Sequence, residues 1–342
     1  MTFTSARPLL AASLALATAV ALTGCATGAA DVDADAAAAA DDAGTVTFSW
    51  DRNTAGDDEE PAYEETTVEV PKNPETIVVF DMASLDTIGA LGGEVAGAPL
   101  ESVPDYLQGH LADDAFNAGT LFEADLVAIE AQQPDLIVIG GRSAGLFDDL
   151  NEIAPTVDLS IAGSFQETLE RNTTFLGEVL GAEDEAAAAL AELEEGIAQA
   201  QAATADAGTG LGLMVSGGRL NAMAPSEGDA TGRNARGGLI YDVFGVEPVV
   251  EDVKAATHGE PVSFEFLLEH NPDFLWVVDR DAATGEENAQ AAAAVLDNDI
   301  VKQTTAYRED QIVYLDPTAW YIVFGGIQTT QIMIDDVLQI AE

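Results

Sequence analysis

The sequence predicts an α/β protein that is built as two lobes with mainly parallel sheets. Short apolar runs rich in β-branched residues alternate with segments of helical periodicity, which is typical of parallel strands joined by crossover helices. The chain has 342 residues, and at about 150 residues per domain this length allows two lobes. Its hydrophobic fraction of 47% is enough to bury a core in each lobe.

The first 56 residues are expected to lie outside the fold. Residues 1–24 carry one charge and an apolar run at 9–22 that is too short for a stable membrane span, so they are predicted to be a secretory signal peptide. The run ends in Leu-Thr-Gly-Cys, which resembles a bacterial lipobox and predicts a lipid anchor on Cys25. An ordinary signal with an accidental cysteine is the alternative. Residues 25–56, rich in Ala, Asp and Gly, are expected to form a flexible tether.

The N-terminal lobe is expected over residues 57–163 and the C-terminal lobe over residues 182–342. The predicted strands are 66–70, 77–80, 95–99, 136–139, 157–159, 211–215, 220–224, 274–278 and 312–315. The predicted helices are 83–91, 125–131, 146–153, 164–180, 183–205, 238–244, 264–270, 288–296 and 325–340.

One pattern occurs in both halves of the chain. Pro-Asp at 134–135 and at 272–273 follows an apolar helix and precedes a buried strand, and an arginine, Arg142 or Arg280, stands eight residues after each proline. The repeat predicts two related lobes, although a common helix–turn–strand connection met twice would look the same. Ligands of open α/β sheets bind beyond the carboxyl ends of the strands. If the lobes face each other, the two arginines converge on one cleft.

The charge of the chain limits its partners. It has 12 Lys and Arg against 61 Asp and Glu, a formal charge of -49, which excludes sequence-independent nucleic-acid binding and docking onto anionic lipid through a basic patch. One cysteine excludes a disulfide framework and Cys-rich metal sites, and three histidines leave little material for a multi-His centre.

An anionic ligand would need a local group of cations in such a molecule. Arg142, Arg280 and Arg236 are candidates, because the first two follow strands and Arg236 lies in a Gly-rich segment just before a predicted helix. Pairing of all three with surface carboxylates is the alternative. His258, in a loop, and Tyr321, after the last strand, have side chains that can bind Fe(III), but a surface His and a packing Tyr would look the same in the sequence.

An ordered set of short motifs runs from about residue 46 to the C-terminus. It comprises VVFD at 78–81, SLD at 84–86, GTLFE at 119–123, PDLI at 134–137, GGRS at 140–143, IAPT at 153–156, YDV at 241–243, THG at 257–259, SFEF at 263–266, DRDA at 279–282, VLDN at 295–298 and YLDPTAWY at 314–321. With this set the chain resembles the ferric-siderophore substrate-binding lipoproteins of bacterial ABC importers, and most closely their catecholate-binding branch.

The resemblance implies a class III periplasmic-binding-protein fold, in which a single long helix, expected at 164–181, joins the lobes and limits their closure. It implies that Arg142, Arg236 and Arg280 hold a trianionic ferric tris-catecholate. It also implies that a His and a Tyr complete the coordination of iron when the siderophore supplies only four oxygens. His258 matches the His motif, and Tyr321 is our choice for the Tyr, with Tyr314 nearby.

These expectations describe an extracytoplasmic receptor, lipid-anchored to the cell membrane, that binds a ferric siderophore between its lobes and delivers it to an ABC permease. No intrinsic cofactor and no nucleic-acid partner are expected, and the protein is expected to be a monomer. The same fold could instead bind haem, cobalamin or another metal chelate. An extracytoplasmic hydrolase is the enzyme alternative, but the sequence has no Gly-x-Ser-x-Gly, His-Glu-x-x-His or P-loop motif, so a non-enzyme is expected.

Overall fold

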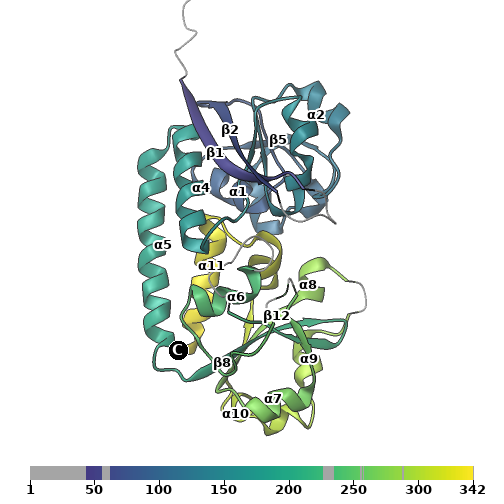
Figure 1. The fold of residues 1–342 in the computed structure, drawn as a ribbon, viewed down its shortest axis with the longest axis vertical. Helices are drawn as coiled ribbons and strands as arrows, with labels where there is room; N and C mark the ends of the chain where they lie inside the picture. Colours follow the sequence, from purple (N-terminus) through teal and green to yellow (C-terminus); the bar gives the residue numbers. More distant parts are fainter. Residues whose placement is uncertain are drawn as a thin grey trace, which may run out of the picture. The chain divides into compact units, whose positions relative to one another are not determined.

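The first lobe of the computed structural model is built on a five-stranded parallel sheet in the order β5-β4-β3-β6-β7 (Figure 1). Its strands are β3 (Ile77–Val79), β4 (Val95–Ala98), β5 (Leu111–Asn117), β6 (Leu136–Ile139) and β7 (Thr156–Asp158). The helices that follow these strands are α1 (Met82–Ala90), α2 (Leu126–Gln132) and α3 (Phe147–Asn151). The predicted parallel α/β lobe is therefore confirmed.

The structure describes residues 44–55, 62–225, 235–254, 256, 258–286 and 289–341, without the side chains of Ala235 and Arg236. All of these residues belong to one unit, Ala43–Glu342. The predicted signal peptide at 1–24 and the predicted lipid site, Cys25, lie outside them. Within the described ranges, no helix combines the length and the apolar character that a membrane span requires.

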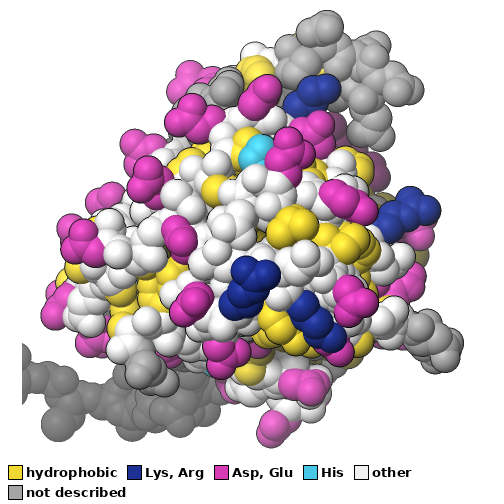
Figure 2. Space-filling view, turned by 90° about the horizontal axis from the view of Figure 1, so that it is seen from below, with side chains coloured by type: hydrophobic (Ala, Val, Ile, Leu, Met, Phe, Trp, Pro, Cys, Tyr) yellow, Lys and Arg dark blue, Asp and Glu magenta, His cyan; other side chains and the backbone are white. Residues whose placement is uncertain are grey.

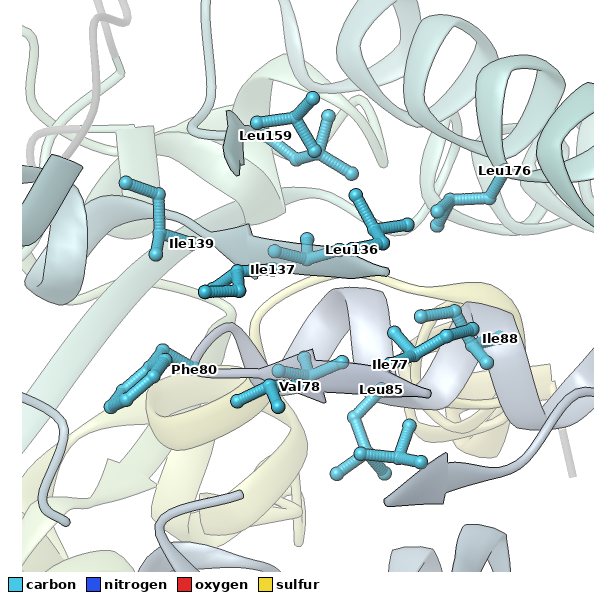
Figure 3. Packing of buried hydrophobic residues seen from close by; sticks show 14 of the residues in the cluster. Ile77, Val78, Phe80, Leu85, Ile88, Leu136, Ile137, Ile139, Leu159 and Leu176 are labelled. Carbon is cyan, nitrogen blue, oxygen red and sulfur yellow. The ribbon is translucent and has the colours of Figure 1, made fainter. Parts of the chain in front are cut away.

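The two central strands of this lobe have no polar face. Every residue of β3 and β6 is buried, because helices cover both sides of a parallel sheet. Figure 3 shows the side chains of these strands packed with Leu85 and Ile88 of α1 and with Leu176 of a helix described below. This rigid centre fixes the carboxyl ends of β3 and β6, where the site residues of this lobe begin.

An antiparallel pair of strands precedes the first sheet. β1 (Thr45–Asn53) pairs along its whole length with β2 (Tyr63–Pro71). Val46, Phe48 and Trp50 alternate into the core of the lobe, and the Phe48 ring lies 4.5 Å from that of Phe175. The flexible tether expected to reach residue 56 is therefore corrected for residues 45–53, where alternating large apolar side chains form a half-buried strand.

The second lobe contains a mixed sheet in the order β11-β9-β8-β12-β13, with β10 beside β8. Its strands are β8 (Thr209–Ser216), β9 (Arg219–Ala222), β10 (Glu247–Pro248), β11 (Glu260–Val262), β12 (Phe274–Asp279) and β13 (Ile312–Leu315). β8, β12 and β13 are parallel, whereas β9 and β11 are antiparallel to their neighbours. The helices of the lobe are α6 (Ala235–Asp242), α7 (Phe264–His270), α8 (Arg280–Thr284), α9 (Ala292–Leu296), α10 (Thr305–Arg308) and α11 (Ile327–Leu338).

The repeated Pro-Asp pattern has the same structure in both lobes. Asp135 Oδ2 accepts a hydrogen bond of 2.9 Å from the amide of Thr76, just before β3. Asp273 Oδ2 likewise accepts one of 2.8 Å from the amide of Thr209, the first residue of β8. In each lobe an aspartate between a helix and a strand thus forms a hydrogen bond with the backbone at the start of a central strand. This shared feature agrees with the prediction of two related lobes.

Two long helices lie next to each other along both lobes (Figure 1). α4 (Phe165–Leu180) and α5 (Glu183–Thr204) each contribute residues to both cores. α4 ends in the first core with Val179, and α5 starts there with Ala186 and reaches the second core with Ile197. The predicted fold, with a long helix joining two lobes, agrees with this arrangement: α5 carries the chain from lobe to lobe, and the expected range 164–181 corresponds to α4.

A glycine allows these two helices to approach closely. A Cβ added to Gly177 of α4 would lie 2.7 Å from the Cβ of Ala186 on α5, a distance that packed side chains do not reach. The small residues at this point explain how both helices fit along one side of the two cores.

α11 joins the lobes a second time. Its residues Met333, Ile334 and Val337 are buried in the second core, but its first turn lies on α1 of the first lobe. There Asp86, which is fully buried, accepts hydrogen bonds from the amides of Gln328 (2.8 Å) and Thr329 (2.7 Å). A carboxylate at a helix N-terminus satisfies free amides and interacts favourably with the helix dipole.

We predict that Asp86→Ala lowers the free energy of unfolding by roughly 2–4 kcal/mol, because it leaves one buried and one partly buried amide of α11 without an acceptor. Urea denaturation followed by tryptophan fluorescence measures the change. Asp335→Ala, which removes an exposed carboxylate from the same helix, is the matched control and should cost less than about 0.5 kcal/mol. Equal losses in the two variants would contradict the role given to Asp86.

The protein should become more stable in mild acid. Burial raises the pKa of Asp81, Asp86, Asp158 and Asp336 above the ordinary value of 3.8. The folded chain therefore binds more protons than the unfolded chain between 3.8 and these raised values, so its stability falls as the pH rises through that window and grows as the pH falls.

We expect Tm to rise as the pH is lowered from neutral toward the ordinary carboxyl pKa of about 4, helped by weaker repulsion among the surface carboxylates. Differential scanning calorimetry measures the shift, and Asp86→Asn, which cannot titrate, should show a smaller rise. A Tm that is constant or falls over this range would contradict the assignment.

Candidate functional site

Three predicted site residues contact one tyrosine where the two lobes meet. Arg142 follows β6, in the 3-10 helix Gly141–Leu146. Arg280 is the first residue of α8, directly after β12. Both contact Tyr321, as does His258. The two repeated arginines therefore reach the same residue from different lobes, Arg142 at its carbonyl and Arg280 at its hydroxyl, because the carboxyl ends of parallel strands from both lobes lie near it.

Tyr321 lies in a π-helical turn, η6 (Thr318–Val323), that follows β13. Two residues before the turn, the side chain of Asp316 accepts a hydrogen bond from the amide of Ala319 (2.8 Å). Trp320 donates from Nε1 to Asp336 of α11 (2.9 Å). Only 6% of Tyr321 is exposed. Turns of this kind are rare and often mark functional sites.

The hydroxyl of Tyr321 is bonded from two sides. Arg280 donates from Nε to Oη (2.8 Å), and its guanidinium carbon lies 5.4 Å from the centre of the Tyr321 ring. His258 Nε2 lies 3.1 Å from the same oxygen. Because Arg280 can only donate, the Tyr321 oxygen accepts in this bond, whereas donor and acceptor in the contact with His258 depend on the imidazole tautomer.

This geometry distinguishes the two candidate tyrosines. Tyr314 lies on β13 and is 43% exposed, whereas Tyr321 is in contact with the imidazole and with a guanidinium. A phenol oxygen and an imidazole nitrogen so close together can act as donors to one trivalent metal ion. No group of three or more His, Cys, Asp and Glu side chains suited to a metal occurs among the residues that the structure covers.

Arg280 is held by residues that the sequence interpretation missed. Its Nη1 donates to Ser216 Oγ (3.1 Å), and Ser216 Oγ donates to Asp281 (2.9 Å). Asp281 is buried and lies 3.9 Å from Arg280 Nη1. Ser216 is the last residue of β8, so the strand-end rule that selected the arginines could have found it.

Arg142 extends from the first lobe to the backbone of the second. Its Nη2 donates to the carbonyl of Tyr321 (3.0 Å) and its Nη1 to the carbonyl of Ile322 (3.1 Å). The side chain predicted to bind a ligand is therefore also a contact between the lobes.

A cavity lies beside Arg142. Both lobes and α4 line it, with Asp81, Phe165, Thr173 and Phe324 among its residues. Burial raises the pKa of Asp81, the nearby charge of Asp158 adds to this effect, and Arg142 opposes it. Asp81 also accepts a hydrogen bond from the amide of Ser84 (3.0 Å) at the start of α1.

The third predicted arginine is placed only by its backbone. Arg236 lies in the first turn of α6, which begins at Ala235 and not near residue 238 as expected. The structure does not describe the side chain of Arg236, so its role in ligand binding stays a prediction.

Comparison with known proteins identifies the family. Residues 77–319 match the family described as Periplasmic binding protein. The chain belongs to this family. It is also 35% identical over 272 residues to the petrobactin-binding protein YclQ of Bacillus subtilis, a match that covers 78% of this chain and 83% of YclQ.

Solved structures of this family have the same fold. A periplasmic binding protein from Xylanimonas cellulosilytica is 73% identical, with a TM-score of 0.84 over 87% of this chain and 99% of that chain. The catecholate-siderophore-binding protein VctP of Vibrio cholerae is 30% identical, with a TM-score of 0.73 over 86% of this chain and all (100%) of VctP. The predicted periplasmic-binding-protein fold is therefore confirmed.

Proposed function

We propose that this protein is the extracytoplasmic receptor of an iron importer, which binds an anionic ferric siderophore between its lobes and delivers it to an ABC permease. The observation that carries the proposal is the contact of Arg280 and His258 with the hydroxyl of Tyr321. Relatives that bind petrobactin and catecholate siderophores support the ligand class.

Charge explains why arginines would select such a ligand. The molecule has a formal charge of -49, and Figure 2 shows acidic side chains scattered over one face with few Lys or Arg among them. A ferric catecholate complex is an anion, so it needs a place where guanidinium groups offset this field. Arg280, with Arg142 and Arg236, would form charge-assisted hydrogen bonds with the chelate oxygens.

His258 and Tyr321 would add iron coordination to this charge recognition. Fe(III) favours oxygen donors and accepts imidazole, and a siderophore with four donor atoms leaves two positions open on an octahedral ion. The Tyr321 oxygen and the His258 nitrogen would fill them, and the bound ion would favour loss of the phenol proton. A siderophore with six donor atoms would need only the charge.

The remaining parts of the proposal concern attachment and transfer. A lipid on Cys25 would hold the receptor at the membrane as a monomer, and a permease would accept the ferric complex. Proteins of this family bind rather than transform their ligands, so the proposed cargo leaves chemically unchanged and no intrinsic cofactor is needed.

We predict that Arg280→Gln weakens the binding of ferric catecholates by about 1–3 kcal/mol, because a charge-assisted hydrogen bond to the anion is lost. Quenching of tryptophan fluorescence measures the affinity, since Trp320 is next to Tyr321 in the chain. Arg308→Gln is the matched control, because Arg308 is exposed and precedes the amino end of β13, whereas Tyr321 follows its carboxyl end. If haem or cobalamin binds and no ferric siderophore does, the proposal is wrong.

His258→Ala and Tyr321→Phe should each lower the affinity for ferric siderophores with four donor atoms by at least about tenfold, which is ~1.4 kcal/mol. The affinity for siderophores with six donor atoms should fall much less. Parallel titrations with one ligand of each kind measure the difference. Equal losses for both kinds would remove these two residues as iron ligands while leaving the anion site intact.

A further inference from the structure

The guanidinium group of Arg142 lies at the end of the turn that carries Tyr321. It donates to the carbonyls of Tyr321 and Ile322, which belong to the last three residues of η6. The final carbonyls of a helix have no amide partner within the helix, and cations are favoured there. Arg142 thus caps a helical turn of the second lobe from the first lobe.

This turn depends on contacts from outside. π-helical turns are less favourable than α-helix, and η6 ends at Phe324, a non-glycine residue with φ of +59°. Gly325 and Gly326 follow, with φ of +135° and +85°. A Cβ on Gly326 would lie 2.7 Å from the carbonyl oxygen of Ala83, so the chain turns tightly against the first lobe directly after η6.

The loop that carries Arg142 is itself firmly held. The amide of Gly140 donates to Ser143 Oγ (3.0 Å), and the fully buried Ser143 hydroxyl donates back to the Gly140 carbonyl (3.1 Å). The amide of Gly141 donates to Ser160 Oγ (2.7 Å). The planar guanidinium of Arg142 forms two parallel hydrogen bonds and is carried by a loop that is itself hydrogen-bonded. It can therefore fix the position of the two carbonyls that it contacts.

We propose that Arg142 is a positioning residue, which sets the Tyr321 hydroxyl for iron coordination through the Tyr321 and Ile322 carbonyls, in addition to adding positive charge to the cleft. This inference rests on the proposed function. Carbonyls are neutral, so these two hydrogen bonds orient the guanidinium without neutralising its charge.

The two contributions of Arg142 can be separated. Its charge attracts every anionic chelate. Its two hydrogen bonds to the carbonyls affect only ligands whose iron needs the Tyr321 oxygen. Arg142→Lys keeps the charge and removes the planar fork. We therefore expect little change, below about threefold, for a ferric siderophore with six donor atoms, and a loss of at least about tenfold for one with four.

A double-mutant cycle with Tyr321→Phe tests the link directly. With Phe at position 321, Arg142→Lys should cause no further loss of affinity for the siderophore with four donor atoms. The visible absorption that the Tyr321 phenolate adds to the bound iron, taken as the difference from Tyr321→Phe, should shift or vanish in Arg142→Lys. In the protein without ligand, amide hydrogen exchange of residues 321–326 should be faster in Arg142→Lys than in Arg308→Lys, the matched control.

Binding of the siderophore with six donor atoms shows that each variant is folded. Equal losses for both ligands, a loss that persists in the Tyr321→Phe background, or unchanged absorption and exchange would each overturn the positioning role while leaving the receptor function in place. Failure of the unmodified protein to bind any ferric siderophore would overturn the proposed function itself.

Discussion

The carboxylate of Asp86 accepts the first free amides of α11, and the relation between the two lobes depends on this buried contact. α11 packs its body in the second core, so a bond at its N-terminus ties that core to α1. Together with α4 and α5, it gives the molecule three helices that connect the lobes. Large hinge motions would have to break buried hydrogen bonds and apolar contacts, so small adjustments are the expected response to a ligand. A cleft held in this way is preorganised, which lowers the entropic cost of binding.

Arg142 and Arg280 both form hydrogen bonds with neutral groups. Arg142 donates to two carbonyls, and Arg280 donates to the hydroxyls of Tyr321 and Ser216, with Asp281 at a longer 3.9 Å. Burial raises the pKa of Asp81, so in mild acid this neighbour of Arg142 carries less negative charge. Neutral partners orient a guanidinium without cancelling its charge, and this arrangement suits an anion that must be attracted into a strongly acidic molecule.

The sequence predicted the strands and helices whose apolar residues recur with a regular spacing. Strands such as β6 and β13 were found because continuous β-branched runs between turns have few other interpretations, and the Pro-Asp repeat led to Arg142 and Arg280. β5 was missed because its sequence, LADDAFN, does not alternate between apolar and polar residues: two adjacent exposed aspartates interrupt its half-buried apolar positions. The family resemblance implied a long helix between the lobes, but it could not show whether the helix at 164–180 or the one at 183–205 carries the chain across, because periodicity gives the length of a helix and not its direction in space. The hydrogen bonds of Arg142 to backbone carbonyls could not be predicted. Every residue has a carbonyl, so the amino-acid sequence does not indicate which carbonyl an arginine will contact.

Tyr321 is contacted from both lobes, and this would link the proposed iron coordination to the arrangement of the lobes. Its carbonyl is bonded to Arg142 of the first lobe and its hydroxyl to Arg280 and His258 of the second. Linkage is reciprocal, so a ligand that binds better when the hydroxyl is correctly placed must in turn favour the lobe arrangement in which Arg142 reaches the carbonyl. A chelate that leaves the hydroxyl unused has no such differential affinity and can shift the lobes only through its charge. Two siderophores of equal affinity would therefore hold the lobes together to different degrees, and a permease that recognises both lobes would distinguish them.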